Sequence, residues 1–240
     1  MIRTIYYIIL LYFLSGGVGF YFINRKKDLQ TAWESYRKFI VYFLIINIVF
    51  FSIIIDPVVF RHLAAGIICM GSFELFRLFR LGGYKQKSFF VFSLFVFILL
   101  SSGFILFSGL KKELILFSFL ILSIFDSFSQ ITGQLWGKTK LFSNISPEKT
   151  VGGFVGGAAV AAGSSLFLSG LYEGDALQSL FMSIGVVVFA FSGDLAASLY
   201  KRKYNVKDFS NLIPGHGGFL DRFDSLIAGG AWTALWVYVF

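Results

Sequence analysis

The segment Lys112–Lys138 reads KELILFSFLILSIFDSFSQITGQLWGK. Its first two thirds are nearly all apolar and approach the roughly 20 residues that a helix needs to cross a bilayer. Its last third carries polar or small residues three or four apart: Asp126, Gln130, Gly133, Gln134 and Gly137. Such spacing puts them on one helical face. A charge at that depth normally faces a bundle interior or a water-filled cavity, so we expect this face to form either a site or a clasp between helices.

The rest of the chain has a similar composition. Of its 240 residues, 57% are hydrophobic and 14% charged, and the mean hydropathy is +0.78. The surface of a soluble domain must be largely polar, whereas a membrane protein turns apolar side chains toward lipid. We therefore expect an all-α, polytopic integral membrane protein with about eight transmembrane helices. The expected spans are 4–24, 39–57, 60–78, 88–108, 112–132, 150–172, 176–200 and 222–240.

No polar linker divides the chain, so we expect one membrane domain over 1–240. Within it, 1–110 would form N-terminal helices and 111–240 the half that bears the motifs. The first span lacks the basic start and the cleavage site of a signal peptide, so we expect it to be permanent.

Basic residues gather in alternate loops. The counts of Lys plus Arg are 5, 4, 3 and 5 in residues 25–38, 77–87, 138–149 and 201–222. The other loops hold only Arg3, Arg61, Lys111 and Lys112. The positive-inside rule places the four basic loops in the cytoplasm and both termini outside. The net charge of +8 is then a topology signal, and we expect no nucleic-acid partner.

Two loops contain patterns typical of helix starts. In NRKKDLQTAWESYRK (24–38), Thr31 and Glu34 have capping-box spacing, which is typical of a helix start. A short interfacial helix and a simple basic loop are equally good interpretations of this stretch. Ser146 followed by proline predicts the N-cap of the sixth span. Lys149 and Thr150 would then lie at a positive helix N-terminus, which favours anions.

The sixth span begins with GGFVGGAAVAAG (152–163), in which small residues recur four apart. That spacing is typical of close helix–helix packing in membranes. A phosphate-binding loop would need a Gly-Lys-Ser/Thr ending, which this stretch lacks, so we favour packing.

The seventh span ends with a polar stripe. Asp194 and Ser198 are four residues apart, and Lys201 lies three further on. An acid, a hydroxyl and an amine on one face suit a site that holds a cation together with phosphate oxygens. The alternative is that Lys201 and its basic neighbours only fix the topology.

The stretch PGHGGFLDRFDS (214–225) precedes the last span. Asp221 and Asp224 are three apart, hence on one side of a helix that begins there. With Asp194 they offer hard oxygens for Mg²⁺ bound jointly with substrate phosphates. Arg222 and Lys207 could clamp phosphate oxygens. Gly217 and Gly218 permit close approach of the backbone to a ligand, and His216 would act either as a base or only in positioning the loop.

The stretch SLYKRKYNVKDFSNLIPGHGGFLDRFD (198–224) closely resembles the signature of the phosphatidate cytidylyltransferases, or CDP-diacylglycerol synthases. Upstream residues resemble the second motif block of that family at matching spacing: Asp126, Gly133, Gly137, Lys138, Ser146, Pro147, Lys149 and Thr150. The sequence departs from the family pattern at Tyr200, at Gln130 (usually Tyr), at Gln134 (usually Arg) and at Gly152 (usually Glu).

The resemblance implies a Mg²⁺-dependent reaction of CTP with phosphatidate, which gives CDP-diacylglycerol and pyrophosphate, and it leaves room for a second cation. It implies a helical fold in a bacterial-type plasma membrane, often dimeric, with a polar cavity open to the cytoplasm. The implied metal ligands are Asp194, Asp221 and Asp224, with Lys201 and Arg222 also catalytic. The implied contacts to CTP or lipid phosphate are Ser198, Lys201, Arg202, Lys207, His216, Gly217, Gly218, Asp126, Lys138, Ser146, Lys149 and Thr150.

Other readings stay open at this point. The departures leave room for a different phospholipid, such as an isoprenoid ether lipid. A CTP-dependent kinase for polyprenol or phytol would release CDP rather than pyrophosphate. A transporter that uses Asp126 and Asp194 as ion sites would require repeated halves with broken helices, and the sequence shows no such symmetry.

Overall fold

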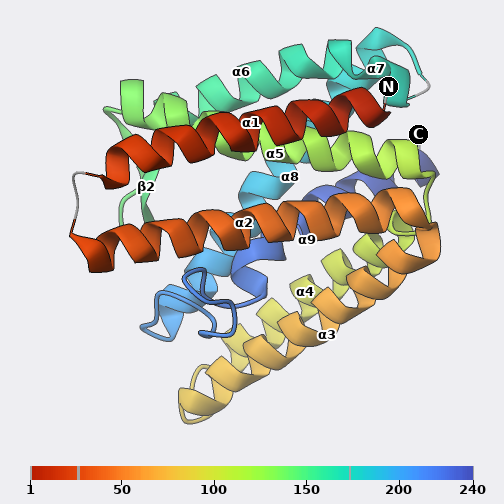
Figure 1. Cartoon of the computed structure of the whole chain (residues 1–240). Helices are drawn as coiled ribbons and strands as arrows, with labels where there is room; N and C mark the ends of the chain where they lie inside the picture. Colours follow the sequence, from red (N-terminus) through yellow and green to blue (C-terminus); the bar gives the residue numbers. More distant parts are fainter. Residues whose placement is uncertain (1, 26–27, 173, 240) are drawn as a thin grey trace.

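The computed structural model describes residues 2–25, 28–172 and 174–239. The chain is almost entirely helical (Figure 1). The helices are α1 (Ile2–Asn24), α2 (Leu29–Ile55), α3 (Pro57–Leu81), α4 (Lys87–Phe107), α5 (Lys112–Trp136), α6 (Val151–Phe167), α7 (Ser169–Tyr172), α8 (Ala176–Lys203) and α9 (Leu220–Val239). A helix lies at each expected span, the sixth being divided into α6 and α7. A short antiparallel hairpin of β1 (Lys140–Phe142) and β2 (Ser146–Thr150) joins α5 to α6.

Five of these helices are long and apolar enough to cross a membrane: α2, α3, α4, α5 and α8. Shorter apolar helices cover Ile2–Val18 and Val151–Phe167. The described chain therefore has the composition of a membrane protein, although not all of the eight expected spans meet this measure. Both termini lie at the same end of the bundle, on the right of Figure 1. The end of α1, the start of α2 and the connections α5–α6 and α8–α9 lie toward the opposite end.

Aspartate caps start three of the long helices, α2, α3 and α8. Asp56 ends α2 and begins α3, where its Oδ1 accepts a hydrogen bond from Val58 N at 2.7 Å. Asp175 caps α8 in the same way through Gln178 N at 2.6 Å. Such caps satisfy backbone N–H groups that have no partner within the helix.

Of the two helix starts considered in the basic loops, the cap at Ser146 was wrong, and the short interfacial helix, left open against a simple basic loop, is not a separate element. The α2 cap is Asp28, whose Oδ2 accepts from Thr31 N at 2.9 Å, and α2 runs unbroken from Leu29 rather than following a separate interfacial helix. Ser146 opens the strand β2 instead of capping α6. The cap of α6 is Thr150, whose Oγ1 accepts from Gly153 N at 3.0 Å. Pairing with β1 keeps Ser146 and Pro147 extended.

The helix α6 packs closely on α5, and glycines make this approach feasible. A Cβ at Gly157 would lie 2.8 Å from Ser129 Cβ and 2.9 Å from the backbone oxygen of Phe125. A Cβ at Gly156 would meet Thr132 Cβ at 2.6 Å. The helical packing expected from the spacing of small residues is confirmed.

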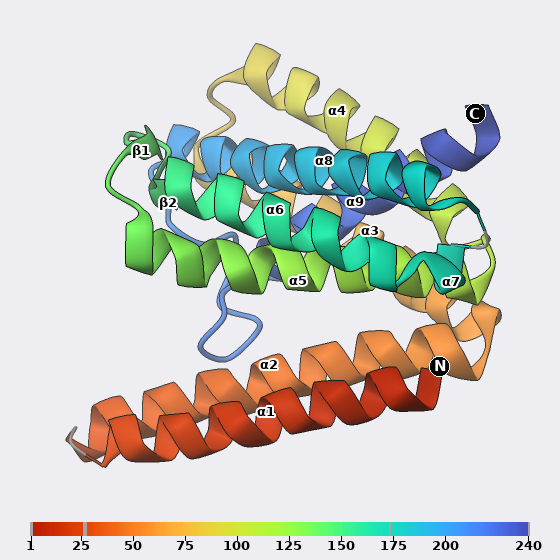
Figure 2. The ribbon, with the colours of Figure 1, turned by 90° about the horizontal axis from the view of Figure 1, so that it is seen from above.

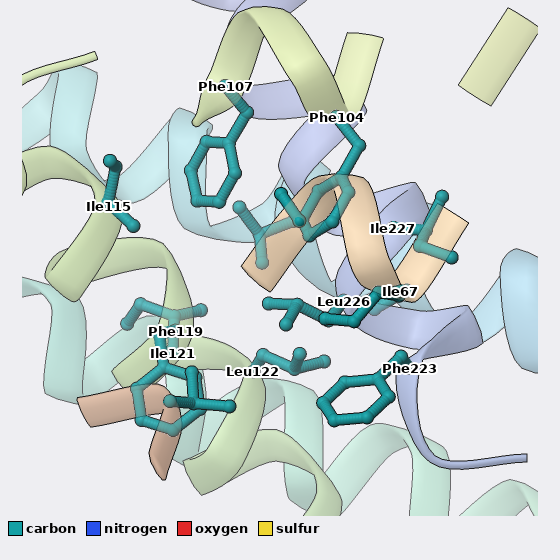
Figure 3. Close-up of a cluster of buried hydrophobic side chains, with 14 of the residues drawn as sticks. Ile67, Phe104, Phe107, Ile115, Phe119, Ile121, Leu122, Phe223, Leu226 and Ile227 are labelled. Atoms are coloured by element: carbon teal, nitrogen blue, oxygen red, sulfur yellow. The ribbon is translucent and has the colours of Figure 1, made fainter. Parts of the chain in front are cut away.

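Figure 2 shows α1 and α2 as an antiparallel pair beside the remaining helices. Within the main body, α5 packs on α6, α8 on α9, and α4 on α9, while α2 contacts α3 and α5. Figure 3 shows part of the buried core, formed by residues of α3, α4, α5 and α9, and further core residues come from α2 and α8. Among its members, Phe104 and Phe107 of α4 face Leu226 and Ile227 of α9. The apolar faces that point outward, such as Phe92 and Phe95 at 65% and 63% exposure, suit contact with lipid.

Candidate active site

A cavity of about 650 Å³ lies between α1, α2, α5, α8, α9 and the loop before α9. All three polar clusters that the sequence singles out contribute to its wall. The predicted site residues that line it are Asp126, Asp194, Lys201, His216, Asp221, Arg222 and Asp224. Its other wall is largely apolar and comes from α1 and α2, so polar chemistry and a lipid-like surface share one space.

The stripe on α8 is bound by ion pairs. Lys149 Nζ lies 2.7 Å from Asp194 Oδ2, and Ser198 Oγ donates to Asp194 Oδ1 at 3.4 Å. Lys201 Nζ lies 2.6 Å from Asp221 Oδ1. The side chain of Asp194 is 39% exposed, whereas that of Asp221 is 1% exposed. Asp194 is therefore the more accessible carboxylate of these two pairs.

Asp221 ties together the loop that precedes α9. Its Oδ2 accepts hydrogen bonds from Phe209 N at 2.8 Å and Gly218 N at 2.7 Å. Gly217 has a φ of +84°, and a Cβ there would lie 2.8 Å from the same oxygen. A glycine is required at this position on both grounds. Both carboxylate oxygens of Asp221 thus have donors from the protein.

A second buried carboxylate, Glu74 of α3, holds the other side of this loop. Its Oε1 accepts from Ser210 Oγ and from Phe219 N at 3.0 Å, and its Oε2 accepts from Leu220 N at 2.8 Å. Glu74 is fully buried. It satisfies N–H groups at the start of α9, which have no partner within that helix.

Sequence reasoning did not include Glu74 among the candidate site residues. A buried acid in an apolar span is a functional signal in itself, and that signal was available. Its partners lie well over 100 positions along the chain, so no local pattern links them. Two more contacts join α3 to the same region: Arg77 Nη1 donates to Phe209 O at 3.0 Å, and Tyr200 OH donates to Leu75 O at 2.8 Å. Tyr200, a departure from the family pattern, is thus a buried contact between helices.

Asp126 and Asp224 complete the acidic wall. Asp224 Oδ1 accepts from the N–H of the adjacent Ser225 at 2.7 Å. The charge of Asp194 repels the carboxylates of Asp126 and Asp224. The charge of Lys149 attracts the Asp126 carboxylate, and the charge of Lys201 attracts the Asp224 carboxylate. This concentration of carboxylates, only partly offset by cations, is the arrangement in which a bound cation lowers the electrostatic energy.

The donor set fits a hard divalent cation that is shared with a substrate. Within the described part of the chain, no three His, Cys, Asp or Glu side chains form a ready-made metal cage. Mg²⁺ is usually held by one or two carboxylates together with substrate phosphates and water, so it needs no such cage. Asp194, Asp221 and Asp224 all line the cavity, but they differ in access. Asp194 is paired with Lys149 and Ser198 yet 39% exposed, whereas Asp221 is 1% exposed and engaged by Lys201 and two backbone N–H groups.

His216, in the loop before α9, lines the cavity. Its carbonyl accepts from Arg222 Nε at 3.0 Å, and its Nδ1 is 3.5 Å from Pro214 O. Partial burial lowers the pKa of His216 below its ordinary value, and the positive charges of Arg222 and Lys38 lower it further. The imidazole is therefore held mainly neutral at neutral pH.

Other predicted phosphate ligands lie outside the cavity wall. Arg202 donates from Nε to Ile145 O and from Nη1 to Val206 O, both at 3.2 Å, which ties the β-hairpin to the end of α8. Thr150 caps α6. Lys138, Ser146 and Lys207 are not among the residues that line the cavity.

The departures from the family pattern on α5 and α6 lie in different surroundings. A Cβ at Gly152 would lie 2.9 Å from the backbone oxygen of Trp136, so a glutamate there would require α6 to move away from α5. Gln130, by contrast, lines the cavity, so an amide stands in its wall where the family usually has the phenol of a tyrosine. Gln134 is exposed near the end of α5 and is not among the lining residues.

Curated bacterial proteins resemble about half of this chain. A phosphatidate cytidylyltransferase of Staphylococcus saprophyticus is 42% identical over 115 residues, which are 47% of this chain and 44% of that protein. One of Staphylococcus aureus (strain COL) is 39% identical over 132 residues, covering 52% and 50%. One of Bacillus subtilis (strain 168) is 43% identical over 108 residues, covering 42% and 39%. The chain thus spans half or less of the length of these curated relatives.

The sequence model described as the cytidylyltransferase family matches residues 81–240, which includes α8, α9 and the loop between them. The acidic and basic residues of the cavity wall that come from α5, α8 and α9 all fall within this range. By this match, the chain belongs to the cytidylyltransferase family.

Proposed function

We propose that this protein transfers CMP from CTP to a membrane lipid phosphate, with phosphatidate as the first candidate, and so forms CDP-diacylglycerol and pyrophosphate. The observation that supports this most is the composition of one cavity. Its polar wall places carboxylates beside Lys201 and Arg222, and its opposite wall is apolar. A nucleotide and a lipid need these two surfaces together. The names of the bacterial relatives agree with this activity.

In the proposed reaction, a phosphate oxygen of the lipid attacks the α-phosphorus of CTP. A new P–O bond forms, the bond between the α-phosphorus and the bridging oxygen breaks, and pyrophosphate leaves with that electron pair. Little covalent chemistry falls to the protein, so positioning and charge neutralisation supply the catalysis. Lys201, oriented by Asp221, and Arg222, fixed through the carbonyl of His216, are placed to neutralise phosphate charge.

We assign Mg²⁺ to Asp194 and Asp224, with CTP phosphates completing its coordination. When bound, the ion would neutralise phosphate charge and orient the leaving group. The third predicted ligand, Asp221, is almost fully buried and accepts two backbone N–H groups besides Lys201, and we propose that its main role is to hold Lys201 and the loop. A second cation stays a prediction.

We further propose that the cavity opens to the cytoplasm of a bacterial plasma membrane. The basic connections favour that side by the positive-inside rule, and CTP is available there. The homodimer implied by the family resemblance is also a proposal. Light scattering of the purified protein in detergent would give its mass, which for one chain is 27.0 kDa.

The function is tested by incubating purified protein with labelled CTP, Mg²⁺ and a panel of lipid acceptors. The panel contains phosphatidate, an isoprenoid ether lipid phosphate, polyprenol and phytol. The expected product is a CDP-lipid from phosphatidate, lost on addition of EDTA. Phosphorylated polyprenol or phytol would identify a kinase instead. Reaction with the ether lipid phosphate alone would support CMP transfer but identify a different acceptor. Gln130, which lines the cavity, would then be the first residue to test for acceptor choice.

A further inference from the structure

The α2 wall of the cavity begins with a cation. Lys38 lines the cavity beside His216 and Arg222, and α2 continues from it with Tyr42 and Ile45 on the same wall. The intervals of four and three residues keep these side chains on one helical face. The wall is therefore charged at one end and apolar further along the helix.

The Lys38 side chain packs against the loop before α9. A Cβ at Gly215 would lie 3.2 Å from Lys38 Cγ, and Gly215 has a φ of +76°. The charges of Lys38 and Arg222 both act on the His216 ring. Three nitrogen-bearing side chains from α2, the loop and α9 thus lie near one another in the cavity wall.

The cations in and beside the cavity wall fall into two groups, one paired with carboxylates and one not. Lys149 is paired with Asp194, and Lys201 with Asp221. Within residues 2–25, 28–172 and 174–239, no carboxylate lies within ion-pair distance of Lys38 or Arg222. The positive charges of Lys38 and Arg222 are therefore available for an anion from outside the protein.

We propose that Lys38, with Arg222 and His216, binds the phosphate monoester of the acceptor lipid, and that the face of α2 beyond it receives the start of an acyl chain. The inference rests on the proposed function and adds to it a subsite for the acceptor. Lys38 lies outside residues 81–240, the range shared with the family. Acceptor recognition would then involve the part of the chain that the family match does not cover.

The test separates the acceptor from the nucleotide. Full-length Lys38→Ala protein in mixed micelles should show a KM for phosphatidate raised by about 10-fold or more, because a charge-assisted contact is lost. Its KM for CTP should stay within about twofold of the wild-type value. Lys38→Arg should restore the lipid KM. The matched control is Lys87→Ala, since Lys87 is exposed at the start of α4 and does not line the cavity.

A second variant tests the apolar part of the wall. Ile45→Trp should raise the KM for long-chain phosphatidate more than the KM for dihexanoyl phosphatidate, because bulk is added beyond the headgroup. Inorganic phosphate should inhibit wild-type protein competitively against the lipid but inhibit Lys38→Ala less. Inhibition by phosphate with no effect of Lys38→Ala on lipid KM would show a free-phosphate site and overturn the lipid assignment.

The proposed function and this inference can fail separately. If wild-type protein makes a CDP-lipid but Lys38→Ala changes only the KM for CTP, the inference is wrong and the function stands. If wild-type protein turns over no lipid phosphate, native mass spectrometry of bound phosphatidate still decides the subsite. Weaker binding to Lys38→Ala than to Lys87→Ala supports it, and equal binding overturns it.

Discussion

Two carboxylates determine the position of the loop between α8 and α9. Asp221 binds Phe209 N and Gly218 N, and Glu74 binds Ser210 Oγ and the first N–H groups around the start of α9. Because Asp221 also binds Lys201, the loop, the cation and the acidic wall form one connected unit. Leaving any of these buried donors without an acceptor costs about 1–3 kcal/mol.

Glu74→Gln tests this connection from outside the cavity. The amide keeps the size of the side chain but turns an NH₂ group toward donors, so we expect kcat to fall by about 10- to 100-fold, equivalent to about 1.4–2.7 kcal/mol. Glu74→Asp should recover part of the activity. Steady-state kinetics with size-exclusion profiles would check this. Glu34→Gln is the control, because Glu34 is exposed at the start of α2. Full activity of folded Glu74→Gln would refute the role.

His216 provides a prediction on pH. Burial and the charges of Arg222 and Lys38 lower its pKa in the folded protein, while the unfolded chain keeps the ordinary value of 6.5. Between those two values the unfolded state binds more protons, so stability falls as the pH drops below about 6.5. The thermal midpoint of wild-type protein should therefore decrease from pH 7.5 to pH 5.5 by more than that of His216→Asn. An equal decrease in both proteins would contradict the argument.

At the scale of elements, the sequence predicted the helices well and their connections poorly. Apolar length placed a helix at each of the eight expected spans, because bilayer-length segments must satisfy their own backbone groups. The start of α6 was wrong because Ser146 and Pro147 are extended by pairing with β1. The cap of α2 is Asp28 rather than Thr31, because the Asp28 carboxylate accepts the hydrogen bond from Thr31 N. Such choices depend on partners that local spacing does not reveal.

The α5–α6 contact can be tested with two glycines on one helix. Gly157→Ala should destabilise the protein by about 1–3 kcal/mol, since the new Cβ would meet Ser129 Cβ at 2.8 Å. Gly163→Ala is the matched control, because nothing lies within 4 Å of a Cβ there. Alanine should be neutral or stabilising at that position by up to about 1 kcal/mol. Thermal unfolding of both variants in detergent checks the difference, and equal stability would refute close packing.

Part of the candidate site could be predicted from helical spacing in the sequence. Residues fixed by helical spacing, such as Asp194, Lys201 and Asp224, do meet at one cavity. Arg202, whose phosphate role stays a prediction, donates to carbonyls of neighbouring loops, which helical spacing did not indicate. Glu74 and Lys38 come from distant helices, and only the packing of the whole chain brings them to the site.

For the whole molecule, we propose a single orientation in the membrane. Both termini lie at one end of the bundle, and the basic connections lie toward the other. In a Cys69→Ser background, Arg3→Cys should react with a membrane-impermeant maleimide in intact cells. Asn211→Cys, in the loop before α9, should react only after permeabilisation. The reverse pattern would place the cavity outside and contradict the proposed access to CTP.

The central claim concerns which phosphorus of CTP reaches the lipid. CTP carrying ³²P at the α-position and, separately, at the γ-position can be incubated with the protein, phosphatidate and Mg²⁺. The account predicts α-label in the lipid product, γ-label in pyrophosphate, and loss of both in Asp224→Asn. γ-Label in the lipid, or α-label that stays in free CDP, would contradict it.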